Sequence, residues 1–295
     1  METSTYLVKH IVLYIENPNA YSQYCYSQSV QKFFVARVDV DSSNRAMFEK
    51  QFARIHKITQ LRVQNDFSFK YDFLFCSSLK ELYITNSKNC VTDTYRLIGT
   101  LKETLTLLYI DDNGVKDIID HFNKWKISGL KLKKLALRVP ELSLERMNEV
   151  FVLDEIVSFE LHFYNDVSPY KSLKRLCSSM KKLRSINISW CNFSFEKVMQ
   201  QLLGLRLYKI RLENYGREER EITAPEVESL LQGHDLVTLF GISNGIISTG
   251  EILHSERSLG SPELTPAVQN FYENFNKKKF PKIQIVCINN LMCFM

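Results

Sequence analysis

Histidine and cysteine are the residues of this sequence best suited to metal binding, and their spacing argues against it. The 295 residues include seven cysteines and six histidines, with no CxxC and no close histidine pair. Structural zinc sites normally draw their ligands from such close pairs. We therefore expect no bound metal, and we interpret the cysteines as small buried hydrophobes of a reducing compartment.

One combination of residues could form a thiol nucleophile, namely Cys191 with His162 and Glu160, because such a thiol needs a histidine nearby. The repeat described below puts Cys191 in a buried turn, where a thiol is inert packing. The sequence also contains no GxGxxG, GxxxxGK[ST], HExxH or GxSxG motif. We expect no catalytic residues, no cofactor and a function other than catalysis.

Tyrosine and arginine suit a different chemistry, the non-covalent binding of a protein partner. Both types are enriched among the residues that contribute most to protein interfaces. Arg62, Tyr83, Tyr109 and Arg138 are the leading candidates, with aromatic anchors losing water and flanking charges setting specificity. The simpler interpretation is that tyrosine is common in strands. Binding requires that the fold bring these distant residues onto one surface.

A short repeat could position them. The pattern apolar-x-x-apolar-x-apolar recurs along the chain, most clearly from Leu79, Leu105, Leu132, Leu183 and Leu207. Weaker copies start at Val8, Val35, Ile58, Ile156, Leu236 and Phe280. Nine of the ten steps between copies lie between 21 and 29 residues. Such a regular period indicates stacked units that share one core.

This period is the one found in leucine-rich repeats, and the chain resembles that family over nearly its full length. Three copies extend to the longer family motif, with Asn113, Cys191 or Asn244 at the ninth position. In the family this residue bonds to backbone groups in the turn after the strand. The likeness is to intracellular members, including the repeat region of F-box subunits that recognise substrates for ubiquitin ligases. No F-box is visible, because the units begin by Val8. The resemblance implies an adaptor that binds a protein partner.

The segments between the copies carry helix signals. Apolar residues fall at helical spacing in 114–125 and 195–203, and Thr223 to Glu226 forms a possible capping box. Prolines follow caps at Ser168 and Thr265. The sequence therefore predicts an α/β leucine-rich-repeat solenoid of about ten or eleven irregular units. Residues 1–295 would form one domain, with a curved parallel sheet on the concave side, helices on the convex side and a loop insertion at 244–266.

Strand side chains alternate between faces, so the third, fifth and seventh positions of each copy should point to the concave side. The weaker copies place Phe240 and Gln284 in the central column of that surface. The predicted partner-binding residues are Arg62, Tyr83, Tyr109, Arg138, His162 and Arg211. Over all thirty-three such positions, seven residues are basic and six are acidic.

Two alternatives remain open. A nucleic-acid binder could use the basic clusters at 124–134 and 171–184. These clusters lie mostly at predicted helix ends, where cations suit the helix dipole, and phosphate binding would place the basic excess on the concave face. An enzyme could instead build a site near 244–266 with His234 or His254.

The composition indicates a globular protein, with 45% apolar and 24% charged residues and a net charge of +5. No stretch reaches the ~18 apolar residues that suggest a membrane span, and the first residues lack the features of a signal peptide. We expect a protein of the cytoplasm or nucleus that does not bind membranes. The sequence leaves the partner and the oligomeric state open.

Overall fold

The computed structural model divides into two compact units, residues 1–152 and 153–295, and each is described by itself. The described residues are 34–40, 57–64, 79–86, 92–115, 117–140, 142–163, 170–191, 193–215, 222–244, 266–289 and 291–295. The copy predicted from Val8 and most of the predicted insertion at 244–266 lie outside these ranges.

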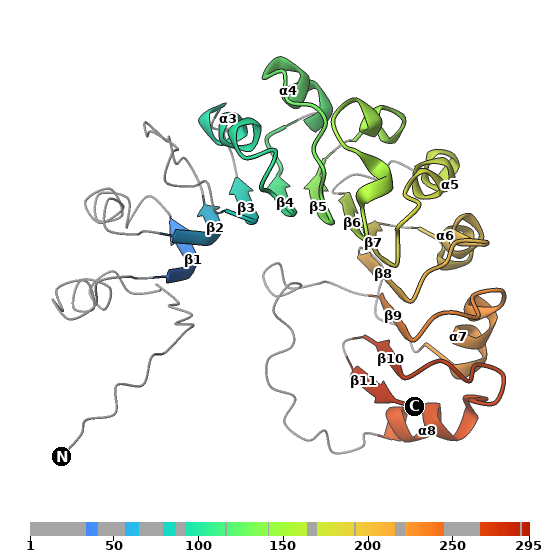
Figure 1. The fold of residues 1–295 in the computed structure, drawn as a ribbon. Coiled ribbons are helices and arrows are strands. Elements are labelled where there is room, and N and C mark those ends of the chain that lie inside the picture. Colours follow the sequence, from blue (N-terminus) through green and yellow to red (C-terminus); the bar gives the residue numbers. More distant parts are fainter. Residues whose placement is uncertain are drawn as a thin grey trace, which may run out of the picture. The chain divides into compact units, whose positions relative to one another are not determined.

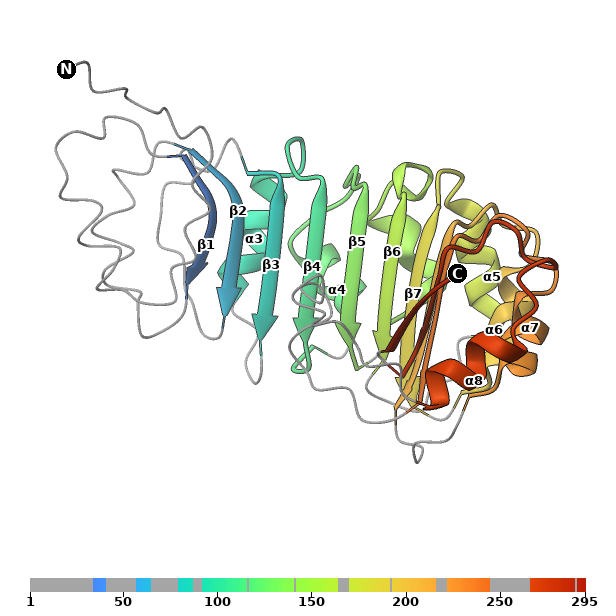
Figure 2. The ribbon, with the colours of Figure 1, turned by 90° about the horizontal axis from the view of Figure 1, so that it is seen from below.

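The first unit contains a parallel sheet whose strands follow the order of the sequence (Figure 2). Its strands are β1 (Phe34–Val40), β2 (Lys57–Gln64), β3 (Glu81–Asn86), β4 (Leu107–Asp112) and β5 (Lys134–Val139). Tyr83 lies opposite Tyr109, and Tyr109 lies opposite Ala136. Equivalent positions of the repeat are therefore neighbours across the sheet.

The second unit continues the same pattern and ends differently. Its parallel strands are β6 (Ser158–Phe163), β7 (Ser185–Cys191), β8 (Lys209–Tyr215), β9 (Leu239–Asn244) and β10 (Ile285–Ile288). The last strand, β11 (Leu291–Phe294), is antiparallel to β10. The prediction of an α/β chain with a mostly parallel sheet is confirmed.

A recurring backbone arrangement joins neighbouring strands. The carbonyl of Lys80 accepts hydrogen bonds from the N–H groups of Thr106 and Leu107, at 2.8 and 3.0 Å. The same double acceptance recurs at the carbonyls of Thr106, Val157, Arg184, Tyr208 and Thr238. Because each of these residues stands just before or at the start of a strand, the arrangement sets the register of the following strand.

Helices occupy one side of the sheet in each unit (Figure 1). The first unit has α3 (Thr92–Thr100) and α4 (Ile118–Lys124), and the second has α5 (Tyr170–Ser179), α6 (Phe195–Leu202), α7 (Ala224–Leu231) and α8 (Pro266–Asn274). Strand residues that face the helices, such as Leu82, Ile110 and Ile188, are fully buried. We call the opposite surface of each sheet the helix-free face.

The predicted helix signals position these helices. Asp117 caps α4 by accepting a hydrogen bond from the Ile119 N–H at 2.9 Å, and Ser194 caps α6 by accepting one from the Lys197 N–H at 3.2 Å. The apolar residues at helical spacing are buried in both helices: Ile118, Ile119 and Phe122 in α4, and Phe195, Val198, Met199 and Leu202 in α6. Helix α4 begins four residues later than the predicted segment.

Helix α7 begins at the predicted place without the predicted cap bond. Thr223 has the extended backbone of an N-cap, but its side chain makes no capping hydrogen bond, so the capping-box prediction is wrong. Pro225 in the first turn favours the helix start. After the helix, Gly233 adopts a φ of 79°, and a Cβ there would lie 2.9 Å from Leu203 Cδ2. The positive φ favours glycine at this position, and a Cβ would also displace the end of the Leu203 side chain.

The segment after β5 departs from the predicted strand–turn–helix unit. Two 3-10 helices, η2 (Leu144–Glu149) and η3 (Leu153–Glu155), follow β5, whereas an α-helix follows β3, β4, β6, β7, β8 and β9. Leu144 and Met147 of η2 are buried. The shorter helix therefore still covers the core of the unit.

Large aromatic side chains fill the core of the first unit between the helices and the turns. Phe122 packs edge-on against Tyr95 and Phe151, with ring centroids 5.5 and 5.6 Å apart. All three side chains are at most 2% exposed. Offset and edge-to-face contacts of this kind add to the stabilisation from apolar burial.

The central column predicted from the two weak copies is wrong, by one residue for the copy at Leu236 and by three residues for the copy at Phe280. Phe240 is fully buried against the helices instead of lying on the open surface. The register pairs Ile210 with Phe240 and Phe240 with Val286, so Gly241 and Cys287 occupy the helix-free face in place of Phe240 and Gln284. A slip of one residue exchanges the two faces of a strand.

The polar residue of the turn also stands one position earlier than predicted. Asn113 is exposed, whereas Asp112 is fully buried and accepts hydrogen bonds from the Gly114 N–H and the Tyr95 hydroxyl, at 3.0 and 3.2 Å. In β8 the buried Asn214 donates to the Phe193 carbonyl at 2.8 Å. Cys191 is half-buried at the end of β7, so the expectation of a buried turn position is also wrong.

The β10–β11 hairpin closes the second unit. Asn289 in its turn adopts a φ of 44°, which asparagine tolerates. The backbone N–H of Phe294 in β11 donates to the hydroxyl of Tyr272 in α8, and burial raises the pKa of that hydroxyl despite this bond. None of the described helices is both long and apolar enough to cross a membrane.

We expect that deleting 282–295 will send the chain to the insoluble fraction. The deletion removes β10 and β11 and the buried side chains of Ile283, Val286 and Cys293, so the edge of β9 and its apolar core become exposed. Fractionation and gel filtration measure this. Phe294→Ser is the control, because Phe294 is already 63% exposed. A truncated chain that stays in solution and unfolds cooperatively would refute the expectation.

Candidate functional site

Two tyrosines lie side by side on the helix-free face of the first unit. The ring centroids of Tyr83 and Tyr109 are 5.9 Å apart with a 38° angle between the rings. Each hydroxyl donates to the carboxylate two residues along its own strand, Tyr83 to Glu81 at 3.2 Å and Tyr109 to Asp111 at 3.3 Å. The rings are thus held in fixed positions, which lowers the conformational entropy lost on binding.

Arg138 on β5 joins this cluster through Asp111. Its guanidinium Nη1 lies 3.5 Å from Asp111 Oδ2, and the two side chains are 5% and 17% exposed. Asp111 stands opposite Arg138 in the strand register. We call Tyr83, Tyr109, Asp111 and Arg138 the tyrosine cluster.

Arg62 is placed beside the tyrosine cluster by its backbone, since β2 pairs Arg62 with Tyr83. Its side chain lies outside the described part of the structure. Over β3 to β5 the helix-free face carries two acidic residues, Glu81 and Asp111, and two basic ones, Lys134 and Arg138. This balance gives no concentration of positive charge to which phosphate groups would bind.

The other two predicted residues, His162 and Arg211, belong to the second unit. His162 on β6 is 4% exposed and lies opposite Ser189 of β7. Arg211 on β8 forms an ion pair with Glu213, with Nε 2.5 Å from Oε1. Glu213 is 1% exposed, whereas the side chain of Arg211 is 30% exposed. His162 and Arg211 thus share a face but lie on strands separated by β7.

Gly241 has no side chain, and the side chain of Arg211 occupies the space beside it. A Cβ at Gly241 would lie 3.1 Å from Arg211 Cγ, so any side chain there would push the arginine away. Arg211 also lies near Cys287 across this glycine, and burial raises the pKa of the Cys287 thiol although Arg211 acts to lower it. The sequence analysis missed Gly241 and Cys287. Alignment on the buried Val237, Phe240 and Ile242 would have found Gly241, and alignment on the buried Ile283 and Val286 would have found Cys287.

Of the residues considered for catalysis, Glu160 and His162 lie on β6 and Cys191 ends β7. His162 pairs with Ser189 in the register, two residues before Cys191. The described residues contain no group of three or more side chains that could hold a metal ion. His254 lies outside them.

His234, the other histidine of the enzyme alternative, has a structural contact. Its Nε2 lies 3.3 Å from the Met199 carbonyl of α6, and the side chain is 6% exposed. A carbonyl only accepts, so Nε2 carries the proton of the neutral ring. Burial lowers the pKa of His234, partly offset by the Met199 carbonyl and by Asp235.

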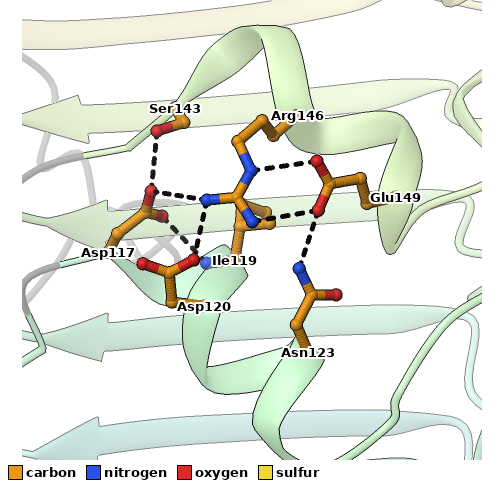
Figure 3. Close-up of polar contacts among 7 residues, drawn as sticks. All are labelled: Asp117, Ile119, Asp120, Asn123, Ser143, Arg146 and Glu149. Carbon is orange, nitrogen blue, oxygen red and sulfur yellow. Dashed lines mark hydrogen bonds and ion pairs between the residues drawn. The ribbon is translucent and has the colours of Figure 1, made fainter.

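A polar cluster of the first unit surrounds Arg146 of η2 (Figure 3). Arg146 contacts Asp120 at 2.7 Å, Glu149 at 2.9 Å and Asp117 at 3.8 Å. Ser143 donates to Asp117, and Asn123 donates to Glu149, each at 2.7 Å. Hydrogen bonds from Arg146 and Asn123 hold the pKa of Glu149 below its usual range.

These contacts link equivalent positions of consecutive repeats. The pairs Ser143–Asp117, Arg146–Asp120 and Asn123–Glu149 are each separated by 26 residues. The cluster therefore ties η2 to α4. Its donors and acceptors bind one another, and we interpret it as a structural contact.

The basic segments of the nucleic-acid alternative lie only partly at or after helix ends, since Lys171, Lys174 and Arg175 belong to the body of α5. Lys124 ends α4, and Lys126, Lys131 and Lys133 follow in the exposed connection to β5. In the second unit, Lys182 pairs with Glu155 at 2.7 Å. Arg184 lies over the ring of Tyr208, 6.0 Å from its centroid.

Comparison of the chain with protein-family models and with curated proteins finds no match.

We expect Arg146→Met to lower the midpoint of thermal unfolding, most strongly at low salt. The substitution leaves the carboxylates of Asp117, Asp120 and Glu149 close together without their shared cation, and salt would screen the repulsion. Lys102→Met is the control, since Lys102 lies 3.9 Å from Glu103 and both are exposed. Equal midpoints for the two variants would contradict the role given to Arg146.

We expect the protein to lose stability as the pH falls below about 6.5, the ordinary histidine value, in part through His234. Because its pKa is lowered in the folded state, the unfolded chain binds a proton that the folded chain does not, which favours unfolding. Urea unfolding at about pH 7.5 and about pH 5.5 measures the effect.

In this experiment His234→Gln, which can still donate to the Met199 carbonyl, should show a smaller loss of stability between the two pH values. Met199→Leu keeps the carbonyl and the side-chain volume, so it should behave as the wild type. If His234→Gln loses as much stability as the wild type, His234 is not a source of the pH dependence.

Proposed function

We propose that the chain is a leucine-rich-repeat protein whose helix-free sheet face binds a protein partner, so that it acts as a non-catalytic adaptor. The repeat period, the parallel strands in sequence order and the helices on one side support the repeat assignment. Substrate recognition for a ubiquitin ligase is the adaptor role that the resemblance favours.

The single observation that carries the proposal is the tyrosine cluster. The adjacent rings of Tyr83 and Tyr109 are oriented by bonds to carboxylates, and Tyr83 is 7% exposed beside the more open Tyr109. Tyr109 and Asp111 are half-buried, so each keeps surface for a partner. Burial of such anchors at an interface contributes about 2 kcal/mol or more each.

The proposed location is the cytoplasm or nucleus. Cys177, Cys191, Cys287 and Cys293 are free thiols, which suits a reducing compartment. Burial raises the pKa of Cys177 to about 12, so this thiol is unreactive packing.

Affinity capture from cell extract tests the proposal. We expect the wild type to retain one folded protein, and Tyr109→Ala to weaken its binding by roughly 30-fold, the equivalent of one strong anchor. The double variant Tyr83→Ala/Tyr109→Ala should abolish capture. Tyr208→Ala is the matched control, because Tyr208 is an exposed tyrosine outside the tyrosine cluster. Thermal unfolding of each variant shows whether it is folded.

Nuclease treatment in parallel separates the alternatives. Capture that is lost with nuclease and insensitive to the tyrosines would mean electrostatic binding to nucleic acid, and the proposal would fail. Capture that is unaffected by both would place the partner on another surface.

A further inference from the structure

The helix-free face of β6, β7 and β8 carries two rows of polar side chains in register. The first row is Glu160, Asn187 and Arg211, and the second is His162, Ser189 and Glu213. The residues between them, Leu161, Ile188 and Leu212, are buried against the helices. Six polar side chains thus occupy a surface three strands wide.

The second row is buried although it lies on the face without helices. His162, Ser189 and Glu213 are 4%, 2% and 1% exposed. Burying polar atoms is costly unless they are hydrogen-bonded or paired. Arg211 supplies this pairing for Glu213, at 2.5 Å.

Two atoms of β7 have no such partner. Ser189 Oγ and Asn187 Oδ1 are buried and form no hydrogen bond within the protein. They belong to residues two apart on one strand, so both lie on the helix-free face. Ser189 stands directly between His162 and Glu213 in the register, and Asn187 between Glu160 and Arg211.

The chemistry around these atoms selects a ligand class. An amide oxygen only accepts hydrogen bonds, whereas a hydroxyl can accept or donate. Glu160, Glu213 and Arg211 give the two rows a formal charge of −1 with His162 neutral. An anion is therefore disfavoured, and a cation with several donors is complementary.

We infer that this face binds an arginine side chain of the protein partner, with Asn187 Oδ1 and Ser189 Oγ accepting from its guanidinium and the carboxylates of Glu160 and Glu213 supplying the opposite charge. A guanidinium carries five donors in one plane and suits a row of acceptors. The inference rests on the proposed function, because it names part of the surface that the partner would present.

The test uses the full chain and the capped tripeptide Gly-Arg-Gly, titrated to millimolar concentration and followed by amide NMR shifts of β7 and β8. We expect saturable shifts centred on Asn187 and Ser189. The same peptide with citrulline, which keeps the shape and loses the charge, should bind at least tenfold more weakly. The double variant Asn187→Leu/Ser189→Ala should also lose at least tenfold. Ser185→Ala, on the same face of β7 at its other end, should bind as the wild type.

Equal binding of the citrulline peptide would overturn the inference, as would absence of shifts or stronger shifts from a capped Gly-Glu-Gly peptide. The peptide titration requires no knowledge of the partner, so it fails independently of the capture experiment. Tyrosine-dependent capture without peptide binding would refute the arginine site alone. Peptide binding with capture that ignores the tyrosines would refute the role of the tyrosine cluster alone.

Discussion

The hydrogen bonding between successive parallel strands is the constraint on which the other features depend. A carbonyl at the start of one strand accepts two N–H groups from the beginning of the next repeat, as Lys80 does from Thr106 and Leu107. Because side chains alternate along a strand, this register decides which residues meet the helices and which form the opposite surface. Tyr83 and Tyr109 become neighbours although 26 residues separate them.

The two units differ in how the polar side chains of the helix-free face are hydrogen-bonded. In the first unit the tyrosine hydroxyls bond to Glu81 and Asp111, and Arg138 pairs with Asp111. The aromatic rings are therefore the groups that a partner would contact. In the second unit Glu213 is paired with Arg211, whereas the oxygens of Asn187 and Ser189 are buried without protein partners. One surface thus suits apolar contact and the other suits hydrogen bonding.

The sequence predicted the strands and helices well where apolar spacing was unambiguous. It failed around Val237, because Leu236 and Leu239 fill the first two positions of the repeat one residue too early, although Gly241 then stands at the third. There the large ring of Phe240 decides the register by its burial. The tyrosine pair followed from the correct register of β3 and β4. The ion pair of Arg211 with Glu213 and the closeness of Gly241 depend on side-chain conformation, which the pattern of residue types does not contain.

The chain reverses direction at Asn289, and this reversal limits how further parallel strands could be added to the sheet. Solenoids lengthen in evolution when a repeat is duplicated and the new strand pairs in parallel with the last one. Here β11 occupies the outer edge of β10 in the opposite direction. The next backbone donor outward, the N–H of Phe294, is bound by Tyr272. A further repeat strand placed beside β11 would meet an antiparallel strand with an occupied donor, so the hairpin opposes extension of the parallel pairing at this edge.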